Sequence, residues 1–216
     1  MYAAETTATA NNKDIKSKTI ANGNNTDFVK IAIVVNGIKT NNGSIATNDK
    51  RKQFSGGYMD YKRILTIQDI SCVGQCSLTV ALPVISACGI ETSVLPSAVL
   101  STHTSGFSGF TFRDLTDDMM AISEHWKKEG LSFDGIYTGY LGSSRQIEYV
   151  KHIIKNNTAS GSLVVVDPAM ADNGNLYPGF DSAFVEAMKG LCAKADFVVF
   201  KPYGREDILE ALQRAR

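Results

Sequence analysis

The chain has 216 residues, enough for one well-buried domain, and its 22 basic and 22 acidic residues give a net charge of zero. No net field draws the protein toward nucleic acid or an anionic membrane, so we expect neither as a partner. The sequence contains no run of about 18 apolar residues and no charged-then-apolar leader pattern, which predicts a cytoplasmic protein.

The first 58 residues differ in composition from the rest. They hold nine of the thirteen Asn, no Pro or Trp, and one apolar run of note, Ile31–Val35, a candidate for an added strand. Such a segment buries too little surface to offset the entropy of ordering it, so we expect most of residues 1–58 to be disordered. Met59 follows the sequence SGGY, which can be encoded with a purine run typical of ribosome-binding sites. We therefore expect translation to start naturally at Met59.

From Arg63 onward, apolar runs of strand length alternate with helical patterns. This alternation indicates an α/β fold with a doubly wound, mostly parallel sheet, right-handed crossovers and helices on both faces. We expect strands at 63–69, 91–102, 133–141, 162–168 and 196–200, and helices at 76–88, 114–128, 144–156 and 180–195, the last capped by Asp181. Ligands of such sheets bind beyond the carboxyl ends of the strands, which selects the loops 69–75, 101–108, 139–143 and 167–175.

The first of these loops, DISCVGQCS, joins a strand-end Asp69 to Gly74 ahead of a helix. Gly74 permits a close backbone approach, and the helix N-terminus offers free N–H groups, although the loop is neither GxGxxG nor a P-loop. Cys72 and Cys76 are four residues apart, but no second pair or nearby His completes a zinc set. We expect all four cysteines of the chain to be reduced.

The second and third loops suit a polar, aromatic ligand. STHTSGFSGF is rich in hydroxyls and small residues, which favours a mobile lid or a hydrogen-bonding wall. His103 within it is either a base or, with no second catalytic partner evident, a structural hydrogen-bonding residue. Tyr140, in TGYLGS, either stacks on a flat ligand ring or packs as a half-buried core aromatic.

The fourth loop carries two carboxylates. Asp167 ends the apolar run 163–166, so we expect its side chain to point beyond the sheet, and Asp172 lies five residues on, within reach of the same space. Carboxylates in that place can hold Mg²⁺ beside phosphates, because Mg²⁺ keeps several waters and takes only one or two protein carboxylates. The alternative for Asp172 is a turn cap, as is common in Asp-Asn-Gly sequences.

In this order, RILTIQD, VGQCS, STHTSGF, YTGYLGS and VVVDPAMADNG resemble the pyridoxal/pyridoxamine kinases of the ribokinase-like superfamily, over about residues 62–199. The resemblance implies ATP-dependent phosphorylation of the 5′-hydroxymethyl group of a vitamin B6 vitamer, with ATP and Mg²⁺ as cofactors. Members of the family commonly dimerise, which makes a homodimer a possible assembly here.

The resemblance also implies roles for single residues in substrate binding. Asp69 falls where such kinases carry a small polar residue, usually Ser, against the pyridine ring. An Asp there is similar to the pyridoxamine-directed branch, where a carboxylate can pair with a protonated ring nitrogen or an amine. Thr104 and Ser105 fall on the substrate-contacting pair after the family's His, and we add Gly74 and Tyr140 to the expected substrate site.

On the nucleotide side, Asp167 falls on the Asp of the family's D-P-V-M-G motif, near the ATP phosphates and the metal. Asp172 is close to a second metal-side acid of some members. The family then continues with P-N-x-x-E, a Lys, a Gly-rich anion hole and a G-x-G-D whose Asp takes the proton from the substrate hydroxyl. This chain instead reads DFVVFKPYGREDILEALQRAR.

The sequence therefore supplies no counterpart of the family's catalytic Asp. The stretch 179–181, Gly-Phe-Asp, comes too early for the G-x-G-D and precedes a helix that Asp181 is expected to cap. We expect a truncated kinase domain over 59–199. A missing base alone costs about 10²–10⁴-fold in rate, and phosphoryl transfer further depends on charge stabilisation, so the chain is expected to have lost most of its acceleration.

Two readings of residues 200–216 stay open. In the first, a frameshift lies near Phe200, because FKPYGR can be encoded so that the next frame reads Ser-Asn-Leu-Thr-Glu, close to P-N-x-x-E. In the second, EDILEALQRAR forms an amphipathic helix that packs on the sheet through Ile208, Leu209 and Leu212. Two alternatives to a vitamin B6 kinase also stay open, namely a hydroxymethylpyrimidine kinase and a non-catalytic remnant that only binds a vitamer.

Overall fold

The computed structural model describes residues 62–104, 106–172 and 175–199, with the side chain of Asp172 left aside. Several expectations fall outside these residues. They concern the disorder of 1–58 with its run Ile31–Val35, the start at Met59, the role of Ser105 and both readings of 200–216.

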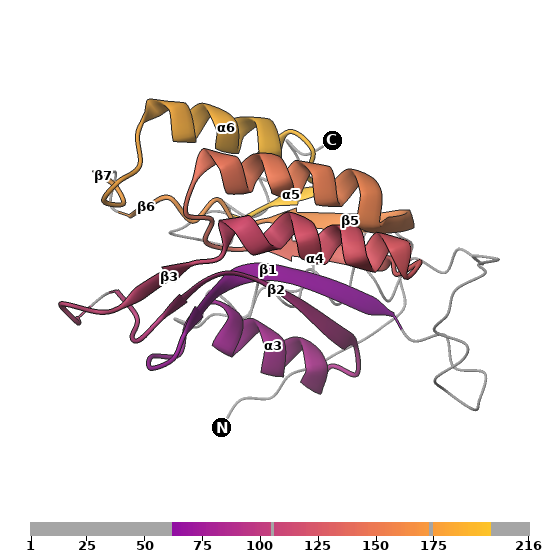
Figure 1. Ribbon diagram of the computed structural model, residues 1–216, viewed down its shortest axis with the longest axis horizontal. Coiled ribbons are helices and arrows are strands. Elements are labelled where there is room, and N and C mark those ends of the chain that lie inside the picture. Colours follow the sequence, from indigo (N-terminus) through magenta and orange to yellow (C-terminus); the bar gives the residue numbers. More distant parts are fainter. Residues whose placement is uncertain (1–61, 105, 173–174, 200–216) are drawn as a thin grey trace, which may run out of the picture.

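Within these described ranges, six strands form one mixed sheet in the order β3-β2-β1-β4-β5-β8 (Figure 1). All neighbouring pairs are parallel except β2 with β3, which is antiparallel. Two further short strands, β6 and β7, form a separate antiparallel ribbon. The strands are β1 (Arg63–Ser71), β2 (Glu91–Leu100), β3 (Phe112–Asp114), β4 (Phe133–Thr138), β5 (Thr158–Val166), β6 (Ala171–Asp172), β7 (Asn175–Leu176) and β8 (Phe197–Val198).

Helices cover both faces of this sheet. Helix α3 (Leu78–Ala87) packs against β1 and β2 on one face, while α4 (Thr116–Lys128), α5 (Ser144–Asn157) and α6 (Ser182–Cys192) lie side by side on the other (Figure 1). Right-handed crossovers require this division, because the connection from β1 to β2 crosses the sheet in one direction and all later connections cross it in the other. The predicted doubly wound α/β fold is confirmed.

Two apolar clusters hold the layers together. The larger lies between the sheet and α4–α6 and contains Leu65, Ile67, Met119 and Ile147, all fully buried. The smaller lies on the α3 face around Ile64. Consecutive residues of β1 point to opposite faces, so this strand feeds both clusters, and its continuous apolar run is what a strand buried on both faces requires.

The structure corrects some predicted boundaries. The helix expected from Cys76 begins at Leu78, because Ser77 has a φ of 48° and cannot be helical. Strand β5 begins at Thr158, ahead of the predicted start at residue 162, because Thr158 pairs with Phe133 before a register shift. Strands β3, β6 and β7 were not expected. Within the described ranges, no helix is long and apolar enough to cross a membrane.

Candidate functional site

The carboxyl ends of β1 and β4 form the point at which the strand connections change direction, so ligand binding is expected there. Strand β4 ends at Thr138, which pairs with Ile67, whereas β1 runs on to Ser71 beside β2. A register irregularity lies opposite Asp69, where two residues of β2 face one of β1. Such irregularities are common next to functional sites, because they redirect side chains.

Asp69 is a buried carboxylate, with only 5% of its surface exposed. The hydroxyl of Ser71 donates to its Oδ2 at 3.2 Å. Among the described residues, no Lys, Arg or His forms an ion pair with it. Burying a carboxylate is costly unless it is paired and hydrogen-bonded, so Asp69 offers a place for a cationic partner.

Tyr140 lies beside this carboxylate. Burial raises the pKa of its hydroxyl, and the negative charges of Asp69 and Asp114 raise it further, so the phenol stays protonated and can donate a hydrogen bond near neutral pH. One face of its ring stacks on Phe180 at 5.8 Å between centroids, and Phe180 stacks on Phe184 at 3.8 Å. The structure thus brings Asp69 and Tyr140 together, as a shared site requires.

Gly74 lies where the β1–α3 loop meets the β2–β3 hairpin. Its φ is 102°, and a Cβ at this position would lie 2.7 Å from the Cβ of His103, so only glycine fits without displacement. The backbone N–H of His103 donates to the carbonyl of Val73 at 2.8 Å and joins the two loops. The close approach expected of Gly74 is therefore made to protein, and Thr104, the next hairpin residue, is exposed.

Asp167 follows β5 directly and is 8% exposed. Its backbone N–H donates to the carbonyl of Thr138 at 3.1 Å, which ties the end of β5 to the end of β4. Burial, joined by the charge of Asp167, raises the pKa of the Cys192 thiol to about 11. Asp172 lies in β6, across the ribbon from Asn175.

A metal site would have to rest on few protein ligands. Within the part of the chain that the structure describes, no group of three or more His, Cys, Asp or Glu side chains is placed to hold a metal. Asp167, one carboxylate at a strand end, fits the small number of protein ligands that Mg²⁺ takes when phosphates and water complete its shell.

Among the described residues, the buried hydroxyls of Thr102 and Thr138, near these strand ends, have no hydrogen-bond partner. Leaving a buried hydroxyl unpaired costs about 1–3 kcal/mol. Native proteins contain few such groups, and those they keep often lie at functional sites.

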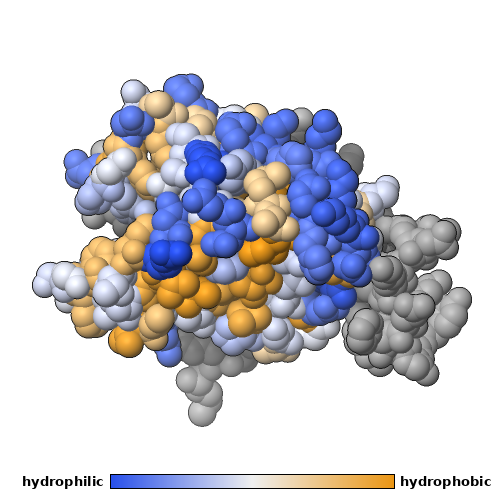
Figure 2. Space-filling model, viewed as in Figure 1, coloured by the Kyte–Doolittle hydropathy of each residue, from blue (hydrophilic) through white to orange (hydrophobic). Residues whose placement is uncertain are grey.

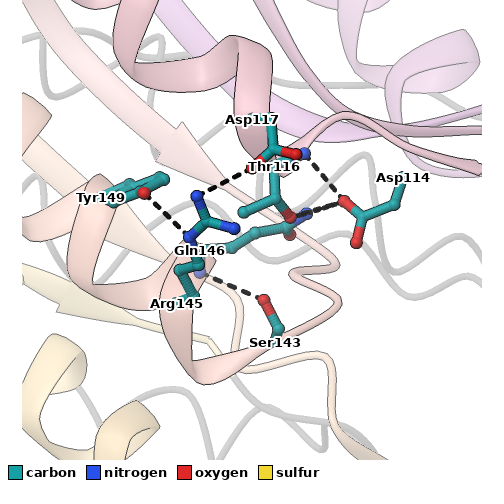
Figure 3. Close-up of polar contacts among 7 residues, drawn as sticks. All are labelled: Asp114, Thr116, Asp117, Ser143, Arg145, Gln146 and Tyr149. Carbon is teal, nitrogen blue, oxygen red and sulfur yellow. Dashed lines mark hydrogen bonds and ion pairs between the residues drawn. The ribbon is translucent and has the colours of Figure 1, made fainter.

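The sequence reasoning missed a polar network around the buried Gln146 that also includes Asp114 and Thr116 (Figure 3). Burial alone would raise the pKa of the Asp114 carboxyl, but hydrogen bonds from Thr116 and Gln146 and the charge of Arg145 lower it overall. One signal was available, since Ser143 and Gln146 have the Ser-x-x-Gln spacing of a capping box. Ser143 does cap α5, accepting from the Gln146 N–H at 3.2 Å.

Solved structures similar to this one are kinases. A protein from Bacteroides thetaiotaomicron, provisionally assigned as a phosphomethylpyrimidine kinase, is 39% identical with a TM-score of 0.66, over 74% of this chain and 60% of its own. A second crystal form of it, solved with pyridoxal, is 41% identical with a TM-score of 0.63, over 72% of this chain and 59% of its own.

Pyridoxal kinases are similar as well. The enzyme from Lactobacillus plantarum is 34% identical with a TM-score of 0.63, over 71% of this chain and 60% of its own. The enzyme from Leishmania donovani, solved with ADP and pyridoxamine, shares the fold with a TM-score of 0.56 at 23% identity, over 68% of this chain and 52% of its own.

The chain spans about 60% of the length of the first of these proteins. No protein-family model matches the sequence, and no curated protein matches it.

Proposed function

We propose that this chain, which belongs to the ribokinase-like pyridoxal kinase family, binds a vitamin B6 vitamer between Asp69 and Tyr140. Its similarity to kinases supports a phosphotransferase, and we propose phosphoryl transfer from ATP to the 5′-hydroxymethyl group as the activity of the whole protein. Pyridoxal in one similar structure and pyridoxamine in another support the choice of ligand.

The observation that carries this proposal is the buried Asp69 carboxylate, which no described cationic side chain neutralises. A vitamer supplies that charge through its protonated ring nitrogen, and pyridoxamine carries a second cationic group in its aminomethyl substituent. Opposite charges attract strongly where little water screens them, so a cationic ligand regains what the burial of Asp69 costs. We therefore propose pyridoxamine as the preferred vitamer.

Tyr140 would complete the ligand site from the other side. Its protonated hydroxyl can donate to a ring substituent, and the stack with Phe180 holds the phenol ring in place. Thr104 and Gly74 belong to the walls of the same site, through the hairpin and the loop that meet at His103.

On the nucleotide side, Asp167 would hold Mg²⁺, with Asp172 as a second acid, and bound ATP would supply the phosphoryl group. The 216 residues contain no G-x-G-D, and we assign no catalytic base. We therefore expect the 216-residue chain to bind a vitamer and to phosphorylate it slowly or not at all.

Isothermal titration of the 216-residue chain with pyridoxamine tests the proposal. A hydrogen bond to a charged group contributes about 1.5–3 kcal/mol, so Asp69→Asn is expected to weaken pyridoxamine binding roughly 10- to 150-fold. Asp134→Asn is the matched control. Asp134 is similarly buried at 8% exposure, but it pairs with Lys62 and the Arg63 N–H at the opposite end of the sheet. Equal loss in both variants, or no binding by the unmodified chain, would refute the assignment.

A hydroxymethylpyrimidine is the second candidate ligand, because the Bacteroides thetaiotaomicron protein of 39% identity is provisionally assigned as a kinase of phosphomethylpyrimidine, the phosphorylated form of such a ring. Titration with hydroxymethylpyrimidine beside the three vitamers separates the two. Tighter binding of the pyrimidine would replace the vitamer in the proposal. Formation of the phosphorylated ligand together with an equal amount of ADP from Mg-ATP would establish that the chain is itself a kinase.

A further inference from the structure

One buried amide joins four separate segments around the candidate site. The side chain of Gln146, 1% exposed in the first turn of α5, donates from Nε2 to the carbonyl of Ser97 at 3.0 Å and to Oγ1 of Thr116 at 2.8 Å. It also lies 3.2 Å from Oδ1 of Asp114. Its Oε1 accepts from the N–H of Gly142 at 2.8 Å. The amide thus reaches β2 and the Tyr140 loop as well as Asp114 at the end of β3 and Thr116 at the start of α4. Figure 3 shows the last two beside Gln146.

The arrangement of hydrogen-bond donors and acceptors in this network requires a side-chain amide at position 146. The hydroxyl of Thr116 donates its proton to Asp114, so its oxygen is free to accept from Gln146. The backbone N–H of Thr116 donates to the same carboxylate at 2.8 Å. A Glu at 146 would bring a second carboxylate to Asp114, and a Leu would leave the N–H of Gly142 unpaired. Only an amide satisfies both sides.

Ser97 extends the network to the ligand-side backbone of Tyr140. Its carbonyl accepts from Gln146, and its hydroxyl donates to the carbonyl of Tyr140 at 3.0 Å. The Tyr140 loop is therefore held at two points, at the Tyr140 carbonyl through Ser97 and at the Gly142 N–H through Gln146.

The same carbonyl of Ser97 lies at the base of the β2–β3 hairpin. It accepts from the backbone N–H of Leu115 at 3.2 Å, and the next residue, Ala98, pairs with Asp114. The hairpin that carries Thr104 starts from these pairs and is tied again where the N–H of Ser101 donates to the carbonyl of Thr111. The side-chain amide of Gln146 is therefore hydrogen-bonded both to the base of the β2–β3 hairpin and to the backbone of the Tyr140 loop.

We propose that Gln146 is a positioning residue that fixes the Tyr140 loop and the β2–β3 hairpin relative to each other, so that both present their ligand-contacting residues in one geometry. The proposal rests on the proposed function only in taking a vitamin B6 vitamer as the ligand. The coupling itself is a property of the ligand-free chain.

Amide hydrogen exchange of the full chain without ligand tests the coupling. In Gln146→Leu we expect the N–H groups of Gly142 and Ser101 to exchange at least 10-fold faster than in the unmodified chain. Asn157→Leu is the matched control, because it also removes a fully buried amide from α5. Asn157 pairs with Ser123 of α4, accepting from its hydroxyl at 2.7 Å, at the end of α5 away from the site. In this control, the exchange rates of the Gly142 and Ser101 N–H groups should rise by no more than the variant's loss of global stability predicts.

A milder variant keeps the test sound if Gln146→Leu folds poorly. Ser97→Ala removes the hydroxyl bond to Tyr140 but leaves the carbonyl bond to Gln146. We expect faster exchange in the Tyr140 loop and unchanged exchange at Ser101, since the hairpin keeps its tie.

Pyridoxamine titration then links the coupling to the ligand. Gln146→Leu is expected to weaken binding at least 10-fold, and Asn157→Leu less than 3-fold at a similar loss of stability. Equal exchange and equal binding in the two variants would overturn the proposal. If the unmodified chain binds no vitamer, the proposed function fails, while the exchange data still decide whether Gln146 couples the two segments.

Discussion

Thr138 and Thr66 show how much a buried hydroxyl depends on its partner. Both side chains are fully buried in neighbouring strands of the sheet. Thr66 accepts a hydrogen bond from Nε2 of Gln68 at 2.8 Å, whereas the Thr138 hydroxyl has no partner among the described residues. The same substitution should therefore have opposite effects at the two positions.

We expect Thr138→Val to raise the free energy of unfolding by up to about 1 kcal/mol, because valine keeps the shape and removes an unpaired polar atom. Thr66→Val should lower it by about 1–3 kcal/mol, because the Gln68 amide then loses its acceptor. Urea denaturation of both variants measures the difference. A change of the same sign in both would contradict this account of the Thr138 hydroxyl.

Cys192 gives a prediction for pH. Burial raises the pKa of its thiol from 9.0 to about 11. A group whose pKa is higher in the folded state contributes stability that is complete below its unfolded pKa and is lost as the pH rises through its folded pKa. Stability should therefore fall between about pH 9 and pH 11, and Cys192→Ser should make this fall shallower. The pKa of the Tyr140 hydroxyl is also raised, so part of the fall in stability with rising pH should remain in both proteins.

The same thiol should be slow to react, because the thiolate is the nucleophile. At pH 8 we expect an alkylating reagent to label the exposed Cys72 well before Cys192. Peptide mass analysis after timed quenching measures the order, and faster labelling of Cys192 would contradict its raised pKa.

At the scale of single elements, the helix caps are the features most directly tied to sequence. Asp181 caps α6, accepting from the N–H of Phe184 at 2.9 Å, as its position before the helical pattern predicted. The residue before the cap, Phe180, stacks on Phe184 and on Tyr140.

We expect Asp181→Ala to lower the free energy of unfolding by about 1 kcal/mol, since the Phe184 N–H loses its acceptor. Asp181→Ser should retain most of the stability, because a serine oxygen can take the same bond. Urea denaturation compares the three proteins, and an equal loss in both variants would assign the effect to charge and not to capping.

The elements with strong periodicity could be predicted from sequence, and the rest could not, for identifiable reasons. The helix at α5 was placed almost to its ends, because its apolar spacing is regular, whereas the strand predicted at 133–141 already ends at Thr138 in β4. Strand β3 has three residues, all exposed, and exists only through its pairing with β2. No local pattern encodes such a strand.

The residues of the candidate site also differ in whether the sequence predicts their place. Asp69 and Asp167 could be placed at strand ends by counting apolar runs. The bond between Gln146 and Ser97 joins residues 49 apart in sequence. Gln146 reads locally as a capping residue, and its role between the hairpin and the Tyr140 loop is set by tertiary structure alone.

At the scale of the whole molecule, apolar surface gathers at one edge. Figure 2 shows hydrophobic side chains over the part of this face where β3, β2 and α3 lie. Phe107, Phe110 and Phe112 of the hairpin are 49%, 37% and 45% exposed. Among the described strands, β3 also lies at the edge of the sheet, so its outer backbone groups have no strand partner there and lie beside exposed rings, which favours association.

We predict that the chain self-associates through this edge, in line with a homodimer. Phe112→Lys should shift the mass measured by light scattering toward that of a single 23.4 kDa chain. Leu176→Lys is the control, because Leu176 is 40% exposed on the separate β6–β7 ribbon. A similar shift in both variants would indicate a general effect of added charge and not an interface at β3.

The central position of β1 has a consequence for the order of synthesis. Its first neighbour, β2, follows after one helix, but its second neighbour, β4, lies about 71 residues later, as the bond from Arg63 to Asp134 measures. At about 5–20 residues per second, β1 waits roughly 4–14 s on the ribosome for that partner. For most of this interval Leu65 and Ile67 lack α4, and α5 and α6 follow only after β4. The nascent chain therefore offers chaperones an apolar strand well before the ligand site exists.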